Sequence, residues 1–374
     1  MNTAKPRYLP ADPRAGYLAA EAEIDAAIRR VMHSGHYILG PETEAFEREF
    51  AAWLGTAGCV GVANGTDALE LALRAAGIGP GDKVVTVANT VSATAAAIVA
   101  TGATPLYAEI EPGTMLLDVA ALAAFLETRR DPRIKAVVPV HLYGQAVDLP
   151  RLMEIAAAHH LTVIEDCAQA HGAEVAGRKA GAWGHLAAFS FYPTKNLGAF
   201  GDGGAVVGSD PAALEKVRLW RQYGWRRRYV SDQPGRNSRL DELQAAILRV
   251  RLPRLDAENA QRAGLAARYA ERLLESGLIL PVTATGRRHV WHQYVVRHPR
   301  RDELKAWLET RGVVSGVLYP VPLHRQPAFH RPELSLPATE AACAEVLSLP
   351  LHPGLGRADI DSICDMVLAA PAFA

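Results

Sequence analysis

Residues 163–207 read VIEDCAQAHGAEVAGRKAGAWGHLAAFSFYPTKNLGAFGDGGAVV and hold two apolar strands that each lead into polar side chains. Glu165 and Asp166 stand where the first strand ends, and the second, residues 187–191, leads to Lys195 and a glycine-rich stretch. In parallel sheets, ligands lie beyond the carboxyl ends of the strands. This segment therefore predicts an α/β fold with a ligand site at that edge of the sheet.

Outward from this segment, short strands rich in Val and Ile alternate with helical patterns, which indicates a mainly parallel sheet covered on both faces. A long helical pattern from Leu240 to Leu274 contains Pro253, which should break or bend it. We therefore expect a large domain, residues 1–252, and a smaller C-terminal α+β domain, residues 253–374. The expected strands are 59–62, 84–87, 104–108, 136–140, 162–165, 187–191, 204–207 and 290–297, and the expected helices beyond Pro253 are 302–311 and 339–347.

Composition narrows the class of protein. The chain has 374 residues, 49% of them hydrophobic, with 40 basic and 40 acidic side chains. That length favours two domains, and the charge balance argues against nucleic acid as a partner. No apolar run of about 20 residues suggests a membrane span, and no signal peptide is evident. The four cysteines form no CxxC pair, which argues against a disulfide scaffold or zinc knuckle and predicts a cytoplasmic location.

Four polar side chains recur at successive strand-to-loop edges, namely Asp166, Gln169, Ser190 and Lys195. Taken singly, an Asp at a strand end is most often a turn or cap residue, and a lone loop Lys is a solvated charge. Together they suit pyridoxal phosphate. This cofactor needs a lysine to hold its aldehyde as a Schiff base and a carboxylate to keep its pyridine nitrogen protonated.

The phosphate of that cofactor needs backbone N–H groups and hydroxyls, ideally at a helix N-terminus. Residues 63–68 read ANGTDA, which predicts a strand, a glycine turn and a helix that begins near Thr66 and Asp67. Ordinary helix capping would explain the same residues equally well.

With these motifs in hand, the sequence resembles the sugar aminotransferases of the DegT/DnrJ/EryC1/StrS family, which have the fold type I architecture of pyridoxal-phosphate enzymes. The matching motifs run through nearly the whole chain in family order. They are NGTDAL (64–69), HLYGQ (141–145), EDCAQAHGA (165–173), FSFYPTKNLG (189–198), GRNSRLD (235–241) and LPLHP (349–353).

The resemblance implies a role for each matching residue. Lys195 would bind the cofactor covalently and then serve as general base and acid, and Asp166 would pair with the pyridinium nitrogen. Gln169 would contact the ring hydroxyl. The phosphate would be held by Thr66, the backbone at Asp67, and Ser190, and also by Asn237 reaching over from the neighbouring subunit of a homodimer whose sites lie at the interface.

The resemblance also implies the reaction. An amino acid, usually L-glutamate, would donate its amino group to a nucleotide-linked keto-(6-deoxy)hexose, in amino-sugar biosynthesis for a surface polysaccharide or a glycosylated natural product. The region around Tyr229 hints at a 3-keto sugar. Alternatives are a relative that dehydrates sugars or forms an aromatic amine, and a regulatory protein that binds the cofactor without chemistry. Lys195 argues against dehydration, because relatives with that activity carry His there.

Two departures from the family pattern affect the site. Many members have an aromatic residue that stacks on the cofactor ring, whereas this chain has Val91. The common His-Tyr-Pro motif appears as Leu318-Tyr319-Pro320. We expect Tyr192, Tyr319 and His324 near the sugar. No metal is expected, because the candidate ligands His141 and His171 lack metal-ligand spacing.

Overall fold

The computed structural model describes residues 7–371 and is built around a seven-stranded sheet with the order β1-β9-β8-β5-β4-β2-β3. Within this sheet β9 runs antiparallel to both of its neighbours, and the other adjacent strands pair in parallel. The prediction of a mainly parallel sheet is therefore confirmed. The strands are β1 (Gly58–Val62), β2 (Lys83–Val87), β3 (Thr104–Ala108), β4 (Ile134–Val137), β5 (Thr162–Asp166), β8 (Leu186–Ser190) and β9 (Gly204–Gly208).

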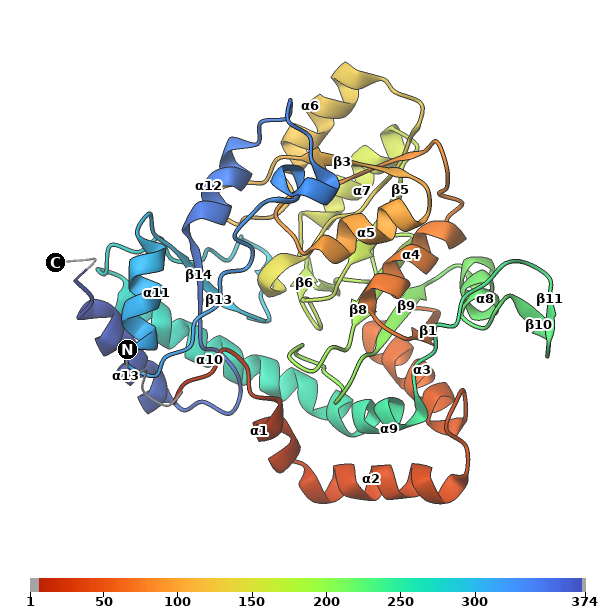
Figure 1. Ribbon diagram of the computed structural model, residues 1–374, viewed down its shortest axis with the longest axis horizontal. Helices are drawn as coiled ribbons and strands as arrows, with labels where there is room; N and C mark the ends of the chain where they lie inside the picture. Colours follow the sequence, from red (N-terminus) through yellow and green to blue (C-terminus); the bar gives the residue numbers. More distant parts are fainter. Residues whose placement is uncertain (1–6, 372–374) are drawn as a thin grey trace.

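Helices cover both faces of this sheet (Figure 1). Successive strand residues alternate between two cores, so that Ile164 packs on one face while Val163 packs on the other. This is the pattern of a strand buried on both sides, and it explains why the strands are mainly apolar. One face is covered by α4 (Gly65–Ala75), α5 (Ser92–Ala100) and α8 (Pro211–Trp220), the other by α3 (Pro41–Leu54), α6 (Val119–Arg129), α7 (Leu149–Ala158) and α9 (Glu242–Arg251).

The N-terminal helices α1 (Pro13–Leu18) and α2 (Glu21–Ser34) lie outside these layers, and α2 packs along α9 (Figure 1). Beyond α9, Pro253 lies in a short 3-10 turn, Leu252–Arg254, which separates α9 from α10 (Leu255–Leu273). The expected break of the long helical pattern is therefore found at Pro253. No helix within residues 7–371 is both long and apolar enough to cross a membrane.

The C-terminal part has its own apolar core, formed by α10, a two-stranded sheet and flanking helices. Tyr8, from the opposite end of the chain, lies in this core and is 2% exposed. Its elements are β13 (Tyr294–Arg297), β14 (Val346–Leu349), α11 (Arg301–Glu309), α12 (Pro337–Glu345) and α13 (Arg357–Leu368). A second core here agrees with a smaller C-terminal domain, and the boundary at residues 252 and 253 stays a prediction.

Several expected elements differ in extent. The strand expected at 136–140 is found at Ile134–Val137, and the helix expected at 302–311 ends at Glu309. The strand expected at 290–297 begins only at Tyr294, because the backbone turns at Trp291, where φ is 49°. The helix expected at 339–347 ends at Glu345, since Val346 and Leu347 extend into β14 and pair with β13.

The remaining elements are short. A hairpin projects from the end of α8 (Figure 1) and consists of β10 (Trp225–Arg227) and β11 (Val230–Ser231). A small sheet consists of β12 (Arg287–Arg288), β6 (Glu174–Val175) and β7 (Arg178–Lys179). Short 3-10 turns lie at Leu142–Gly144, Leu323–Arg325 and Pro327–Phe329.

Candidate active site

The sheet brings Asp166 and Ser190 to one edge. Both are the last residues of adjacent parallel strands, β5 and β8. Lys195 follows Ser190 after a tight turn, in which its backbone N–H donates to the carbonyl of Tyr192 at 2.8 Å. The edge predicted from the sequence is therefore where these polar groups meet.

Asp166 is a buried acid, 4% exposed, with few hydrogen-bond donors around it. Its Oδ2 accepts from the Thr94 hydroxyl at 3.0 Å, and its Oδ1 accepts from the Ala168 N–H at 3.2 Å. Burial raises the pKa of this carboxyl above its usual value, while those two hydrogen bonds and the Lys195 charge act to lower it. A cationic group beside Asp166 would therefore be bound strongly.

Lys195 is half-buried beside Asp166. Loss of hydration on burial lowers the pKa of its amine to about 8, and the negative charge of Asp166 opposes that shift. At pH 7 the fraction of unprotonated amine is then about 300-fold larger than for an ordinary lysine. The amine is suited both to nucleophilic attack on an aldehyde and to proton transfer.

The predicted phosphate site forms where α4 begins. Asn64 caps this helix, and its Oδ1 accepts from the Asp67 N–H at 2.8 Å. Gly65 allows the helix to approach β8 closely, because a Cβ added at Gly65 would lie 2.7 Å from the Ser190 Cβ. The hydroxyls of Thr66 and Ser190 therefore flank the positive end of one helix, which is the arrangement that phosphate prefers.

The cap also qualifies one prediction. In this structure the Asp67 N–H already has the Asn64 side chain as its acceptor. This N–H could bind a phosphate only if the Asn64 side chain moved away from it. The other N–H groups in the first turn of a helix have no acceptor within the helix and could bind a phosphate without such a change. The contribution of the Asp67 backbone stays a prediction.

Gln169 is oriented by its neighbours. It is 6% exposed, and its Oε1 accepts from the Tyr143 N–H at 2.7 Å. The amide nitrogen is thereby turned outward and donates to the Tyr319 hydroxyl at 3.3 Å. Gln169 thus presents N–H groups, which suits a contact with the ring oxygen of the cofactor.

Val91 and Tyr319 line the same cavity, which has a volume of about 350 Å³ and is also bordered by Ser92 and Pro320. Val91 is 41% exposed and precedes the first turn of α5. The structure therefore brings Tyr319 to the site. Tyr192 is exposed and lies two residues after the end of β8.

His324 and Asn237 are the other two predicted residues. His324 is fully buried, and its Nε2 lies 2.9 Å from Glu340 Oε1. Asn237 is exposed beside Arg236, which forms ion pairs with Glu70 and Asp67 on α4. A role for either side chain in binding stays a prediction.

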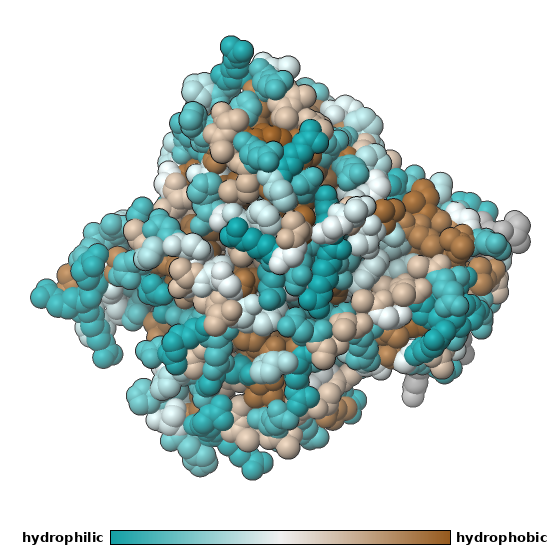
Figure 2. Space-filling model, turned by 180° about the vertical axis from the view of Figure 1, so that it is seen from behind, coloured by the Kyte–Doolittle hydropathy of each residue, from teal (hydrophilic) through white to brown (hydrophobic). Residues whose placement is uncertain are grey.

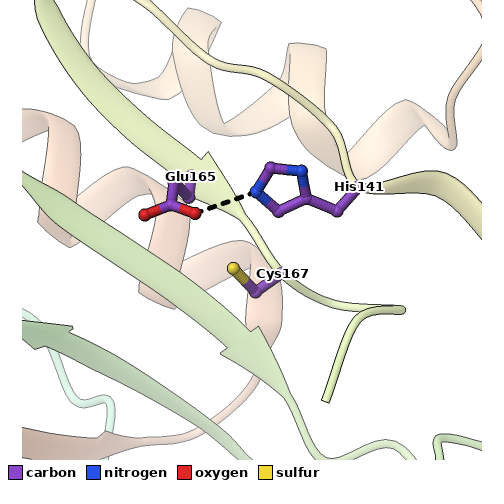
Figure 3. Close-up of side chains that lie close together, drawn as sticks. All are labelled: His141, Glu165 and Cys167. Carbon is purple, nitrogen blue, oxygen red and sulfur yellow. Dashed lines mark hydrogen bonds and ion pairs between the residues drawn. The ribbon is translucent and has the colours of Figure 1, made fainter. Parts of the chain in front are cut away.

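The cluster that most resembles a metal site contains His141, Glu165 and Cys167, which lie within reach of one ion (Figure 3). Its donors are already engaged. His141 Nδ1 accepts from the Val147 N–H at 3.2 Å, so the ring is neutral and its Nε2–H donates to Glu165 at 3.0 Å.

Glu165 also accepts three backbone N–H groups, from Gly181, Trp183 and Gly184. Burial raises the pKa of the Cys167 thiol well above its usual value, so this sulfur keeps its proton. The cluster is best explained as a hydrogen-bonded support for the end of β5, one residue before Asp166.

Several residues around the site were not singled out from the sequence. Thr94 and Thr90 form a chain of hydroxyls that leads to Asp166. Asn196, next to Lys195, donates to Asn259 at 2.8 Å and to the Val290 carbonyl at 2.9 Å. The spacing of four residues between Thr90 and Thr94, where α5 begins, is the one signal that could have indicated the first pair.

A mainly parallel sheet that ends in a buried Asp, a lysine of lowered pKa and a hydroxyl-flanked helix N-terminus defines a pyridoxal-phosphate enzyme of fold type I. The comparisons agree. A model of the DegT/DnrJ/EryC1/StrS aminotransferase family matches residues 19–368, and the chain belongs to that family. The predicted family, fold class and aminotransferase activity are therefore confirmed.

Three relatives illustrate the similarity. The dTDP-3-amino-3,4,6-trideoxy-alpha-D-glucose transaminase of Streptomyces venezuelae is 49% identical over 366 residues, which cover 97% of this chain and 96% of that protein. The crystal structure of S. venezuelae DesV has a TM-score of 0.94, with 49% identity over 97% of this chain and 98% of that one. The structure of NtdA from Bacillus subtilis has a TM-score of 0.85, with 30% identity over 98% of this chain and 87% of that one, and holds the cofactor PMP.

Pyridoxal phosphate is the cofactor, as predicted. The side chains of this site fit the cofactor. The buried carboxylate of Asp166 can accept further hydrogen bonds, the amine of Lys195 has a pKa of about 8, and the amide of Gln169 directs its N–H groups outward.

Proposed function

We propose that this aminotransferase transfers the amino group of an amino acid, L-glutamate, to the 3-keto carbon of a dTDP-linked 6-deoxyhexose. The observation that carries the reaction is the pair formed by Asp166 and Lys195 at one sheet edge. The acceptor is supported by the S. venezuelae relative, whose name specifies a dTDP-linked sugar with a 3-amino group.

Pyridoxal phosphate, when bound, carries the amino group between the two substrates and withdraws electrons from the reacting carbon. Asp166 would supply the negative charge opposite the ring nitrogen, and Gln169 a hydrogen bond to the ring oxygen. Thr66 and Ser190 would hold the phosphate at the start of α4. Thr66 belongs to α4, Asp166 and Ser190 belong to the main sheet, and Gln169 lies in the turn that follows β5.

Lys195 would move the proton. With a pKa of about 8, its amine takes up a proton from the donor carbon readily near neutral pH and can return it on the other side of the transfer. The cavity lined by Val91 and Tyr319 lies beside these groups and offers space for the sugar. We place Tyr319 and Tyr192 against the sugar, and leave His324 as a packing residue of the segment that carries Tyr319.

The hairpin β10–β11 fits a nucleotide diphosphate. It carries three successive arginines, Arg226–Arg228, and the rings of Tyr223, Trp225 and Tyr229, with Trp225 and Tyr229 centred 5.3 Å apart. Figure 2 shows it at the left edge of the molecule as a mostly hydrophilic projection. An exposed basic and aromatic projection is suited to a neighbouring subunit's site, and together with the exposed position of Asn237 it supports our proposal of a homodimer.

We further propose a cytoplasmic location and a role in amino-sugar biosynthesis for a surface polysaccharide or a glycosylated natural product. The location is supported by the cysteines, since all four are free and buried.

One titration tests the reaction and its substrates together. The visible absorption of the purified protein with its cofactor is recorded, L-glutamate is added, and then a dTDP-linked 3-keto or 4-keto sugar. We expect glutamate to bleach the absorption and the 3-keto sugar to restore it. Restoration only by the 4-keto sugar would refute the assignment to carbon 3, and a spectrum that ignores glutamate would refute the donor. The Lys195→Ala variant is the control and should show no turnover.

A further inference from the structure

The Asp166 carboxylate is reached by a short chain of buried hydroxyls. Thr94, on the first turn of α5, has its Oγ1 3.0 Å from Asp166 Oδ2. The Oγ1 of Thr90 lies 3.1 Å from the Oγ1 of Thr94. Both threonines are 1% exposed, so water does not compete for these hydrogen bonds.

When Asp166 is ionised, the chain of hydrogen bonds can run in only one donor-to-acceptor direction. A carboxylate accepts hydrogen bonds and donates none, so the Thr94 proton must point to Asp166. The Thr94 oxygen is then an acceptor, and the Thr90 hydroxyl donates to it. Hydrogen bonds in such a chain polarise one another, so each strengthens its neighbour, and the low dielectric constant of the protein interior increases this effect.

The two hydrogen bonds on Asp166 leave room for a third partner. Oδ2 accepts from Thr94 and Oδ1 from the Ala168 N–H, and each carboxylate oxygen can accept twice. The hydroxyl therefore fixes the plane of the carboxylate without blocking its free edge.

We propose that Thr94, supported by Thr90, is a positioning residue that keeps Asp166 ionised and aimed at the ring nitrogen of the cofactor, and so keeps that nitrogen protonated. This inference rests on the proposed function of Asp166. Without the Thr94 hydroxyl, the buried carboxylate would lose one of its two hydrogen bonds, and the proton shared with the ring nitrogen would move towards Asp166. The cofactor would then withdraw electrons less well.

The test compares four forms of the protein. Thr94→Val removes the hydroxyl and keeps the shape, and Thr94→Ser retains the hydroxyl. Thr86→Val is the matched control, because Thr86 is also a fully buried threonine and donates one hydrogen bond, to the Val138 carbonyl at 2.9 Å. Each form is loaded with pyridoxal phosphate carrying ¹⁵N in the ring, and the ¹⁵N chemical shift reports whether this nitrogen is protonated.

We expect Thr94→Val to shift the ¹⁵N signal towards the value of a neutral pyridine, and Thr94→Ser to keep the wild-type value. A hydrogen bond to a charged group changes such an equilibrium about tenfold, or about one pKa unit. The rate at which glutamate bleaches the absorption should fall by a similar factor. Thr86→Val should change stability alone.

A wild-type ¹⁵N shift in Thr94→Val would overturn the proposal, and so would an equal change in Thr86→Val. Loss of folding in Thr94→Val would leave Thr90→Val, at the far end of the chain, as the deciding variant, with a smaller shift in the same direction expected. Failure of the proposed function would look different, because the wild-type protein itself would then show no protonated ring nitrogen or no response to glutamate.

Discussion

Replacing Gly65 with Ala should weaken cofactor binding without unfolding the protein. The added Cβ would lie 2.7 Å from the Ser190 Cβ and 3.2 Å from its Cα, whereas ordinary contacts begin at 3.4 Å. The start of α4 and the end of β8 must therefore separate by about 0.7 Å, a distance that spoils the geometry of hydrogen bonds made jointly to one phosphate.

The size of the effect follows from the hydrogen bonds at stake. One hydrogen bond to a charged group contributes about 1.5–3 kcal/mol, so its loss weakens binding about 10- to 100-fold. The dissociation constant is measured by titrating pyridoxal phosphate into the cofactor-free variant and following its visible absorption. The thermal transition of the same sample shows whether the fold is retained.

Gly264→Ala provides the matched control. Gly264 lies within α10, is exposed, and has no atom within 4 Å of the position that a Cβ would take. Its replacement should stabilise the helix by about 0.5–1 kcal/mol and leave the dissociation constant unchanged. A folded Gly65→Ala variant that binds the cofactor as tightly as the wild type would refute the idea that α4 and Ser190 hold the phosphate together.

Three further predictions concern charge, assembly and support. In the cofactor-free protein, the rate at which an amine reagent labels Lys195 should rise with pH through an inflection near 8, since burial lowers the pKa of Lys195 and only the unprotonated amine reacts. The variant Asp166→Asn should move this inflection to lower pH, and an unmoved inflection would contradict the idea that the charge of Asp166 opposes the shift. Mixing the variants Lys195→Ala and Asn237→Ala should restore activity to about a quarter of the sites if Asn237 acts across a two-fold interface, because each mixed dimer then has one site with both residues intact. No recovery of activity would mean that Asn237 acts in the site of its own subunit. Glu165→Gln should lower the free energy of unfolding, measured in urea, by about 3–5 kcal/mol, because the amide cannot accept four N–H groups. A rise of the wild-type melting temperature on adding Zn²⁺ would contradict this structural role and would indicate a metal at His141 and Glu165.

The sheet could be predicted well from the sequence because its strands are buried on both faces and are therefore mainly apolar. Val163 and Ile164 illustrate this, since they face opposite cores and yet read alike. The direction of β9 could not be predicted in the same way. A strand buried on both sides has the same pattern whichever way it runs, and the antiparallel pairing of β9 appears only in the fold.

Some residues of the site could be predicted from the sequence and others could not. Asp166 and Lys195 could be predicted because their chemistry is unusual at the end of an apolar strand. Thr94 could not, because its significance lies in a contact with a residue 72 positions away, and that contact depends on how α5 sits over β5. His324 shows the converse, since its place near Tyr319 in the sequence does not bring its ring into the cavity that Tyr319 lines.

Tyr8 has a consequence for how the chain can be divided. It packs in the C-terminal core and its backbone pairs with Val313, so this core depends on a segment that lies before the main sheet in the sequence. A fragment of residues 253–374 expressed alone would lack this ring and should be a poor starting point for a separate domain, whereas joining the neighbourhood of Tyr8 to that fragment would supply the missing piece.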